Sequence, residues 1–374
     1  MAGIYIHIPF CKQSCSYCDF HFSTSLKYKT DLVSGIVTEI ANRKEQLTSR
    51  INTIYFGGGT PSLLTGDDLK RIVESIYKNY NVAPNIEFTL ECNPDDLTQK
   101  KLQELESSGV NRLSIGVQSF NNNELEFFNR AHNSNEAEAS IKRSQDVGFE
   151  NITIDLIYGS PISTDNIWLD NLQKTATFNV PHLSAYGLTV EPKTKLAHQI
   201  ELGQLPKLND DKMIRQFKML IEKTTAFGMT QYEVSNFGKE GFYSQHNSNY
   251  WKGEQYLGIG PSAHSYIAEK RVWNVANNIK YIKALNNNEC YFEEEEIDEK
   301  TAFNEYVLTR LRTIWGVDLD YIQTNFNKKL NAHFQKEIKH YLNSSYLQTD
   351  NNKITLTQEG IFIADKITSD LFYI

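Results

Sequence analysis

The chain has 374 residues, of which 40% are hydrophobic and 22% charged, and its formal net charge is −8. This length suffices for one barrel-sized domain and a smaller second domain. The acidic balance argues against a nucleic-acid partner, and no apolar run approaches the ~18 residues of a membrane span. Since the first residues also lack a basic and apolar leader, we expect a cytoplasmic protein whose thiols stay reduced.

Three cysteines follow the first predicted strand, at residues 3–9. Cys11, Cys15 and Cys18 have the spacing C-x3-C-x2-C, which in a reducing compartment favours metal ligation over disulfides. A structural zinc site would need a fourth cysteine or histidine at finger spacing, and none follows. An iron–sulfur cubane takes one thiolate per iron, so three thiolates would leave one iron open to a small chelating molecule. The motif therefore predicts a [4Fe-4S] cluster.

Strands and helices then alternate. Further strands are predicted at 52–57, 85–91, 111–118, 151–158 and 182–188. Helices are predicted at 28–46, 67–80, 98–108, 135–147 and 164–178. Six strands that alternate with helices predict an α/β fold with a parallel sheet, most simply a (β/α)6 partial TIM-type barrel.

Alternation within the strands indicates a polar barrel interior. In the first strand Ile4, Ile6 and Ile8 form one face, and Tyr5 and His7 lie on the other. The later strands repeat this division between branched aliphatic and polar or small residues. A barrel packed only for stability fills its interior with aliphatic side chains, so this interior is predicted to hold a ligand.

The segment 226–290 is expected to be a loop-rich extension. It concentrates aromatic residues, glycines and two histidines, His246 and His264, a mixture that suits a flat macrocycle carrying a metal. The alternative is a hydrogen-bonded histidine inside an aromatic core. From the residues alone we favour this alternative for His264 and weigh the two equally for His246.

The last part of the chain predicts a separate domain. After an acidic run at 293–296, helices are predicted at 304–313, 319–325, 330–342 and 359–371, with a hairpin at 346–357. This order suggests a winged-helix-like domain, interpreted as a partner or lid domain because acidic neighbours offset its lysines. The predicted domains are 1–225 for the barrel, 226–290 for the extension and 291–374 for the C-terminal domain.

The cysteine spacing, with Tyr17 before the last cysteine, resembles the cluster motif of the radical S-adenosylmethionine (SAM) superfamily, in which SAM chelates the open iron. The Gly-rich turn at 57–62 resembles the segment that holds the amino-acid part of SAM, and we expect its backbone N–H groups to be free for a ligand. A guanidinium suits the SAM carboxylate, and carboxylates suit ribose hydroxyls or the sulfonium. The residues that this resemblance assigns to cofactor binding are Tyr5, Tyr17, Gly58, Gly59, Thr60, Glu91, Gln118, Arg130 and Asp155.

Nearly the whole chain resembles the branch of that superfamily that contains oxygen-independent coproporphyrinogen III oxidase. The oxidase pattern has a further cysteine where this chain has Phe20, and an extension before the cluster motif. The chain is instead similar to HemW-type heme chaperones, which share the Cys-Asp-Phe ending and the motif HNxxYW, here at 246–251. This resemblance implies heme binding with a contribution from His246, heme-accepting and respiratory partner proteins, a homodimer and peripheral contact with the membrane.

Three classes of function follow. The first is a heme chaperone that keeps a SAM-coordinated cluster, and the second is a radical SAM enzyme acting on coproporphyrinogen III or another tetrapyrrole. The third is an iron–sulfur protein with no tetrapyrrole. Phe20 and the first residues favour the chaperone over the oxidase, and the His246 motif favours either over the third class.

Overall fold

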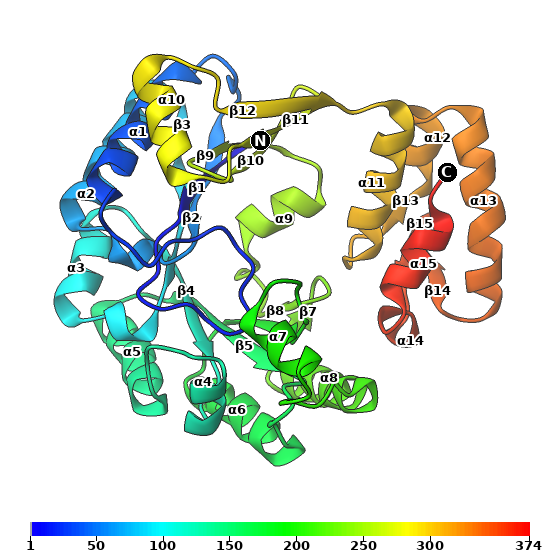
Figure 1. The fold of residues 1–374 in the computed structure, drawn as a ribbon. Coiled ribbons are helices and arrows are strands. Elements are labelled where there is room, and N and C mark those ends of the chain that lie inside the picture. Colours follow the sequence, from blue (N-terminus) through cyan, green and yellow to red (C-terminus); the bar gives the residue numbers. More distant parts are fainter. Residues whose placement is uncertain (1) are drawn as a thin grey trace.

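Six parallel strands, each followed by at least one helix, form the larger domain of the computed structural model, which describes residues 2–374 (Figure 1). The parallel strands are β1 (Ala2–Ile8), β2 (Ile51–Gly58), β3 (Val82–Cys92), β4 (Arg112–Gln118), β5 (Asn151–Tyr158) and β6 (His182–Gly187). They are adjacent in this order in one sheet. The predicted (β/α)6 partial barrel is confirmed.

The helices of the larger domain lie around this sheet, most of them on its outer face (Figure 1). They are α1 (Lys29–Asn42), α2 (Gly66–Asn79), α3 (Gln99–Ser107), α4 (Asn122–Phe127), α5 (Ser134–Val147), α6 (Asp165–Thr177), α7 (Lys195–Glu201) and α8 (Asp210–Ala226). Local sequence fixes several helix starts: Thr65 and Asp68 form a capping box on α2. Ile4, Ile6 and Ile8 are fully buried in the core that includes the apolar faces of the helices, as the strand alternation predicts.

The segment 226–290 is not loop-rich but extends the sheet at both edges. The strands β7 (Thr230–Gln231) and β8 (Asn236–Gly238) lie beyond β6. Beyond β1 lie β9 (Gln255–Ile259), β10 (His264–Ile267) and β11 (Lys270–Asn274), and the edge strand β12 (Phe292–Glu296), which follows this segment, also belongs to this sheet rather than to the C-terminal domain. The helices α9 (Gln245–Trp251) and α10 (Asn278–Asn287) complete the segment. The expectation failed because these strands are short, and β8 and β9 join the sheet by pairing with β6 and β1, which lie far away in the sequence.

The C-terminal domain packs around its own apolar core, centred on Phe303 and Phe334. Its elements are α11 (Glu299–Leu311), β13 (Val317–Asp318), α12 (Leu319–Asn325), α13 (Lys328–Asn343), β14 (Leu347–Asp350), β15 (Lys353–Leu356), α14 (Gln358–Ile361) and α15 (Ala364–Leu371). Three helices with a short strand between the first two, then a hairpin and two further helices, give the expected winged-helix-like order. Within residues 2–374, no helix combines the length and apolarity that crossing a bilayer requires.

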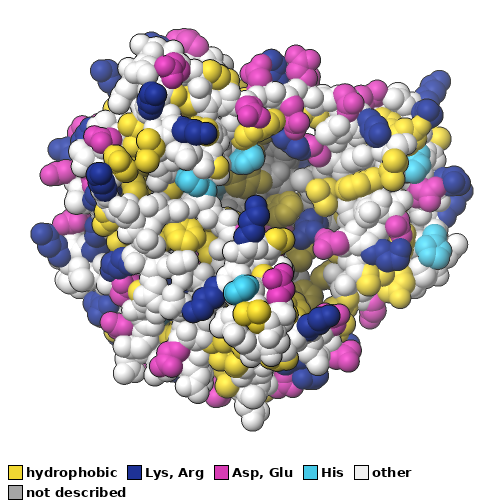
Figure 2. Space-filling model, in the orientation of Figure 1, with side chains coloured by type: hydrophobic (Ala, Val, Ile, Leu, Met, Phe, Trp, Pro, Cys, Tyr) yellow, Lys and Arg dark blue, Asp and Glu magenta, His cyan; other side chains and the backbone are white. Residues whose placement is uncertain are grey.

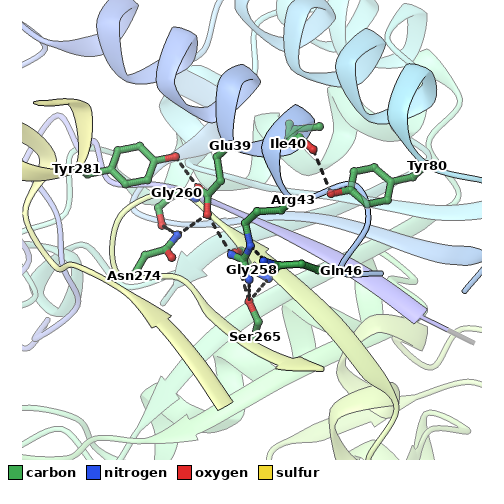
Figure 3. A network of polar contacts seen from close by, with 10 residues as sticks. All are labelled: Glu39, Ile40, Arg43, Gln46, Tyr80, Gly258, Gly260, Ser265, Asn274 and Tyr281. Atoms are coloured by element: carbon green, nitrogen blue, oxygen red, sulfur yellow. Dashed lines mark hydrogen bonds and ion pairs between the residues drawn. The ribbon is translucent and has the colours of Figure 1, made fainter. Parts of the chain in front are cut away.

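A buried ion pair ties the barrel to its added strands (Figure 3). The Glu39 carboxylate accepts hydrogen bonds from Arg43 Nη1 (3.0 Å), Asn274 Nδ2 (2.8 Å), Gly260 N (2.8 Å) and Tyr281 Oη (2.6 Å). The side chains of Glu39 and Arg43 are 0% and 2% exposed. Every acceptor position of this carboxylate is therefore supplied by a donor, as a charge out of water requires.

Arg43 completes the link. It donates from Nη1 to the Gly258 carbonyl oxygen (2.9 Å) and from Nη2 to Ser265 Oγ (3.2 Å). The network thus joins α1 to β9, β10, β11 and α10 (Figure 3).

We expect Glu39→Ala to lower the free energy of unfolding by about 3–5 kcal/mol, because it leaves the Arg43 guanidinium buried without its counter-charge. The exposed pair Lys142–Asp146 has the same i,i+4 spacing, and Asp146→Ala should cost no more than about 0.5 kcal/mol. Denaturant unfolding of both variants measures the difference. Equal losses would show that burial of the Glu39 pair has no special role.

Candidate functional site

The three motif cysteines lie on a loop directly after β1. A backbone hydrogen bond from Cys11 N to the Ser23 carbonyl oxygen (3.1 Å) closes this loop. Cys11, Cys15 and Cys18 are free thiols and half-buried. Burial, followed by the neighbouring thiols, raises the pKa of Cys18 to about 11.

The donor set of this loop, three thiols, suits an iron–sulfur cluster. Within residues 2–374, no three His, Cys, Asp or Glu side chains converge to hold one metal ion. A cubane instead binds each thiolate through a different iron. Three reduced thiols that share one loop fit that arrangement.

The Gly-rich turn at the end of β2 packs directly on the cysteine loop. Gly58 has φ +103°, and a Cβ atom on Gly59 would lie 2.7 Å from the carbonyl oxygens of Ile8 and Phe10. Only glycine therefore permits this approach. The Gly58 N–H donates to Glu91 Oε2 (3.1 Å) and the Gly59 N–H to the Ile8 carbonyl (2.9 Å). The expectation that these N–H groups are free was wrong, because the turn uses them to fix its neighbours.

Two carboxylates lie at the same end of the sheet. Glu91, near the end of β3, accepts from Tyr55 Oη (2.8 Å), and Asp155, in β5, accepts from Ser114 Oγ (3.4 Å). Burial raises the pKa of Glu91 to about 7, with a further contribution from the Asp155 charge. Burial likewise raises the pKa of Asp155 to about 6. A cationic ligand between these groups would favour their ionised forms.

Arg130 connects this end of the sheet to the cysteine loop. Its Nη1 donates to Cys15 Sγ (3.2 Å), and its Nη2 donates to Asn93 Oδ1 (2.7 Å) and the Gly116 carbonyl (2.8 Å). Its Nε is buried without a hydrogen-bond partner. A guanidinium held against a motif thiol, with a donor left over, fits the carboxylate of an amino-acid ligand.

Gln118 and Thr60 lie beside Arg130. Gln118 ends β4 with φ +66°, a left-handed conformation that is costly for a residue with a side chain. The buried Thr60 accepts from Asn93 Nδ2 (3.4 Å). The mouth of the barrel thus brings together Gly58, Gly59, Thr60, Glu91, Gln118, Arg130, Asp155 and the cysteine loop.

Tyr17 and Tyr5 differ in placement. The Tyr17 ring packs edge-on against Phe128, with ring centroids 5.5 Å apart. Since Phe128 lies at the end of α4, this contact joins the cysteine loop to that helix. Tyr5 lies further toward the extension, where its hydroxyl and His7 Nδ1 share a hydrogen bond (3.1 Å). Its ring lies near His246, at a centroid distance of 6.5 Å.

His246 is buried and fully hydrogen-bonded. It is 1% exposed, and its Nδ1 and Nε2 share hydrogen bonds with Thr53 Oγ1 (2.8 Å) and Tyr250 Oη (2.7 Å). Burial lowers its pKa to about 3, so the ring is neutral. The Glu87 carboxylate accepts from the backbone N–H of His246 (2.9 Å) at the start of α9. In this conformation neither ring nitrogen is available to a metal ion.

Sequence reasoning missed several residues of the site. Tyr55 and Asn93 hold Glu91 and Arg130, and the buried Arg112 forms an ion pair with Glu87 (4.0 Å). The alternation of β2 and β3 placed Tyr55 and Glu87 on the interior face, which was the one available signal. Their partners lie on other strands and could not be read from the spacing.

A cleft of about 990 Å³ lies between the barrel and the C-terminal domain. Figure 2 shows this hollow, with histidine and basic side chains near it. Its wall includes Tyr5, His7, Phe20, His21, Tyr250, Trp251, Tyr256, His264, Arg271, Tyr306 and Arg310. Ligand pockets in proteins measure about 300–1,000 Å³ and are lined mainly by apolar and aromatic groups. The cleft is therefore large enough for a macrocycle and extends to the cysteine loop.

The partial barrel, the three-cysteine loop and the Gly-rich turn define a radical SAM protein. The Radical SAM superfamily matches residues 5–174, and the HemN C-terminal domain family matches residues 297–363. More particularly, the chain belongs to the HemW family. It is 32% identical to "Heme chaperone HemW" of Bacillus subtilis (strain 168), with 98% of each chain covered. It is 33% identical to the Lactococcus lactis protein of that name, with 97% of this chain and 95% of the relative covered.

A solved structure shares the fold. Coproporphyrinogen III oxidase (HemN) from Escherichia coli superposes with a TM-score of 0.86 at 21% identity, covering 99% of this chain and 90% of the oxidase. At this identity the likeness establishes the fold alone. The resemblance to HemW-type proteins is confirmed.

The raised pKa of Glu91 predicts a pH-dependent stability of the cluster-free protein. Between pH 4.5, the ordinary pKa of a glutamate, and about pH 7, Glu91 keeps its proton in the folded protein but loses it in the unfolded chain. This contribution to stability is fully present below about pH 4.5 and is lost as the pH rises through 7. Denaturant unfolding should show that the free energy of unfolding of wild type falls, relative to that of Glu91→Gln, as the pH increases between these values. A difference independent of pH would contradict the assignment.

Proposed function

We propose that this protein is a heme chaperone, which binds heme in the cleft and delivers it to acceptor proteins in the cytoplasm or at the membrane surface, respiratory proteins among them. The observation that carries this proposal is the match to Heme chaperone HemW along 98% of both chains. The cleft supports it with aromatic walls and basic side chains, which suit a flat macrocycle with propionates. The family also makes a homodimer an expectation.

Cys11, Cys15 and Cys18 would hold a [4Fe-4S] cluster, with SAM at the adjoining mouth of the barrel. The cluster would supply an open iron for chelation and a source of electrons. Arg130 would bind the SAM carboxylate through its unpartnered Nε. Glu91 and Asp155 would accept hydrogen bonds from the ribose or face the sulfonium, and the Gly58–Gly59 turn would shape the floor.

Replacing Cys11, Cys15 or Cys18 with Ala should abolish the cluster absorbance after anaerobic reconstitution, because each would remove one iron ligand. Cys290→Ala is the matched control, since that thiol is exposed and lies outside the motif. Iron and sulfide analysis quantifies the result. Full iron and sulfide content in the triple Cys→Ala variant would refute the cluster site.

The second candidate is oxidative decarboxylation of coproporphyrinogen III. The shared fold with HemN favours it, but a fold hosts many functions. Phe20 argues against it, because this side chain stands where the oxidase pattern has a further cysteine. It is 68% exposed and lines the cleft. We therefore favour carriage of a tetrapyrrole over its conversion.

A heme titration of the anaerobically purified, cluster-loaded protein should give a saturable Soret band. Coproporphyrinogen III incubated with this protein, SAM and a reductant should remain unconverted. Heme should also pass to a heme-free respiratory cytochrome faster from this protein than from heme-loaded albumin, because a chaperone docks on its acceptor. Formation of protoporphyrinogen IX would overturn the chaperone proposal in favour of the oxidase.

A further inference from the structure

Four histidines lie at or near the cleft, and they differ in which ring nitrogens are already used. His7 is buried, and its two ring nitrogens are hydrogen-bonded to Tyr5 Oη (3.1 Å) and the His21 carbonyl oxygen (3.0 Å). His21 is half-buried, and its Nε2 is hydrogen-bonded to Asn278 Oδ1 (2.8 Å). Hydrogen bonds therefore occupy both ring nitrogens of His7 and one of His21.

His246, in the HNxxYW motif, uses both ring nitrogens, on Thr53 and Tyr250. Its partner Tyr250 lies one turn later on α9 and lines the cleft. The motif thus places a tyrosine ring in the cleft wall and a buried histidine behind it. Binding of iron by His246 would require breaking one of these buried hydrogen bonds, which costs free energy.

His264 is different. It begins β10, is exposed and lines the cleft. Within residues 2–374, neither of its ring nitrogens has a hydrogen-bond partner. The ring lies alongside Trp273, its partner in register on β11, with centroids 6.5 Å apart. The strand pair therefore positions an imidazole whose nitrogens face no competing partner.

The basic side chains of the cleft also differ in availability. Arg271 is paired with the carboxylates of Glu295 (3.4 Å) and Glu305. Arg310 has no carboxylate within 4.0 Å in the described part of the chain. It donates to the Lys252 carbonyl oxygen (3.2 Å) and lies over the Tyr306 ring. Its guanidinium is therefore free to pair with an anionic group at the domain interface.

We propose that His264 is the axial ligand through which this protein binds heme iron, and that Arg310 pairs with a heme propionate. The inference rests on the proposed heme-carrying function and adds the ligand that carries it out. It assigns His246 a positioning role, through Tyr250. A ligand on an exposed strand end at the opening of a cleft also suits a cargo that must leave again.

The test is an anaerobic heme titration of the cluster-loaded wild type and of His264→Ala, His246→Ala and His21→Ala. His264→Ala should shift the Soret band and weaken binding by about tenfold or more, since the iron loses a strong-field nitrogen. Added imidazole should restore the wild-type band in this variant. His246→Ala should keep the wild-type band position even where its affinity falls, and His21→Ala, the control from the same cleft, should keep it too.

Each outcome separates the two proposals. Absence of saturable heme binding by wild type would reject the proposed function. Wild-type binding together with an unchanged band and affinity in His264→Ala would reject the ligand assignment and leave heme carriage standing. A shifted band in His246→Ala that imidazole restores, with His264→Ala unchanged, would transfer the ligand role to His246.

Arg310 is tested with a modified ligand. Arg310→Gln should lower the affinity for heme severalfold without moving the Soret band, whereas its affinity for heme dimethyl ester should equal that of wild type, because the ester carries no charge to pair. An equal loss for both ligands would reject the propionate contact.

Discussion

The Glu39–Arg43 pair is the interaction on which the placement of the cleft depends. A charge pair without solvent is stable only when its remaining donors and acceptors are satisfied, and here the partners come from the added strands and α10 (Figure 3). The constraint therefore acts between distant parts of the chain. It fixes β9 and β10 against the first helix of the barrel, and these strands carry Tyr256 and His264 into the cleft wall.

Polar groups perform a similar task inside the barrel. Glu87 accepts from the first N–H groups of α9, and Arg112 lies beside it without solvent contact. A barrel interior of this kind gives up the apolar packing that would maximise stability. The interior and the C-terminal ends of the strands instead carry hydrogen-bonding groups. These groups orient the cysteine loop, the Gly-rich turn and α9 around the mouth of the barrel.

The two ligand regions share this frame but differ in chemistry. The mouth combines thiols, carboxylates and one guanidinium, the groups that suit a cluster and a zwitterionic cofactor. The neighbouring cleft combines aromatic walls with an unbonded imidazole and an unpaired arginine. Phe20 and His21 lie where the two regions meet, so the cysteine loop forms part of the cleft wall. Because the oxidase has the same architecture, the fold does not distinguish a protein that carries a tetrapyrrole from one that converts it. The distinction depends on the local chemistry of these two regions.

The sequence by itself determined the features that depend on local order. The spacing of Cys11, Cys15 and Cys18, the strand–helix alternation and the two faces of β1 are all properties of short segments, so the barrel, its polar interior and its C-terminal domain could be predicted. The HNxxYW motif likewise pointed to the region that borders the cleft. The extension 226–290 was misjudged because its short strands acquire order only by pairing with β1, β6 and one another.

Only the tertiary structure decided which of these groups are free to act. Thr53, from β2, is hydrogen-bonded to a ring nitrogen of His246. Glu91 accepts the hydrogen bond of the Gly58 N–H, and the Ile8 carbonyl accepts that of the Gly59 N–H. Glu305 forms an ion pair with Arg271 and not with Arg310. His264 was therefore found exposed and unbonded, against the buried position favoured from the residues, and His246, for which the two alternatives were weighed equally, was found buried and bonded. The physical reason is that a hydrogen bond or ion pair needs two groups, and here the second comes from a segment far away in the chain.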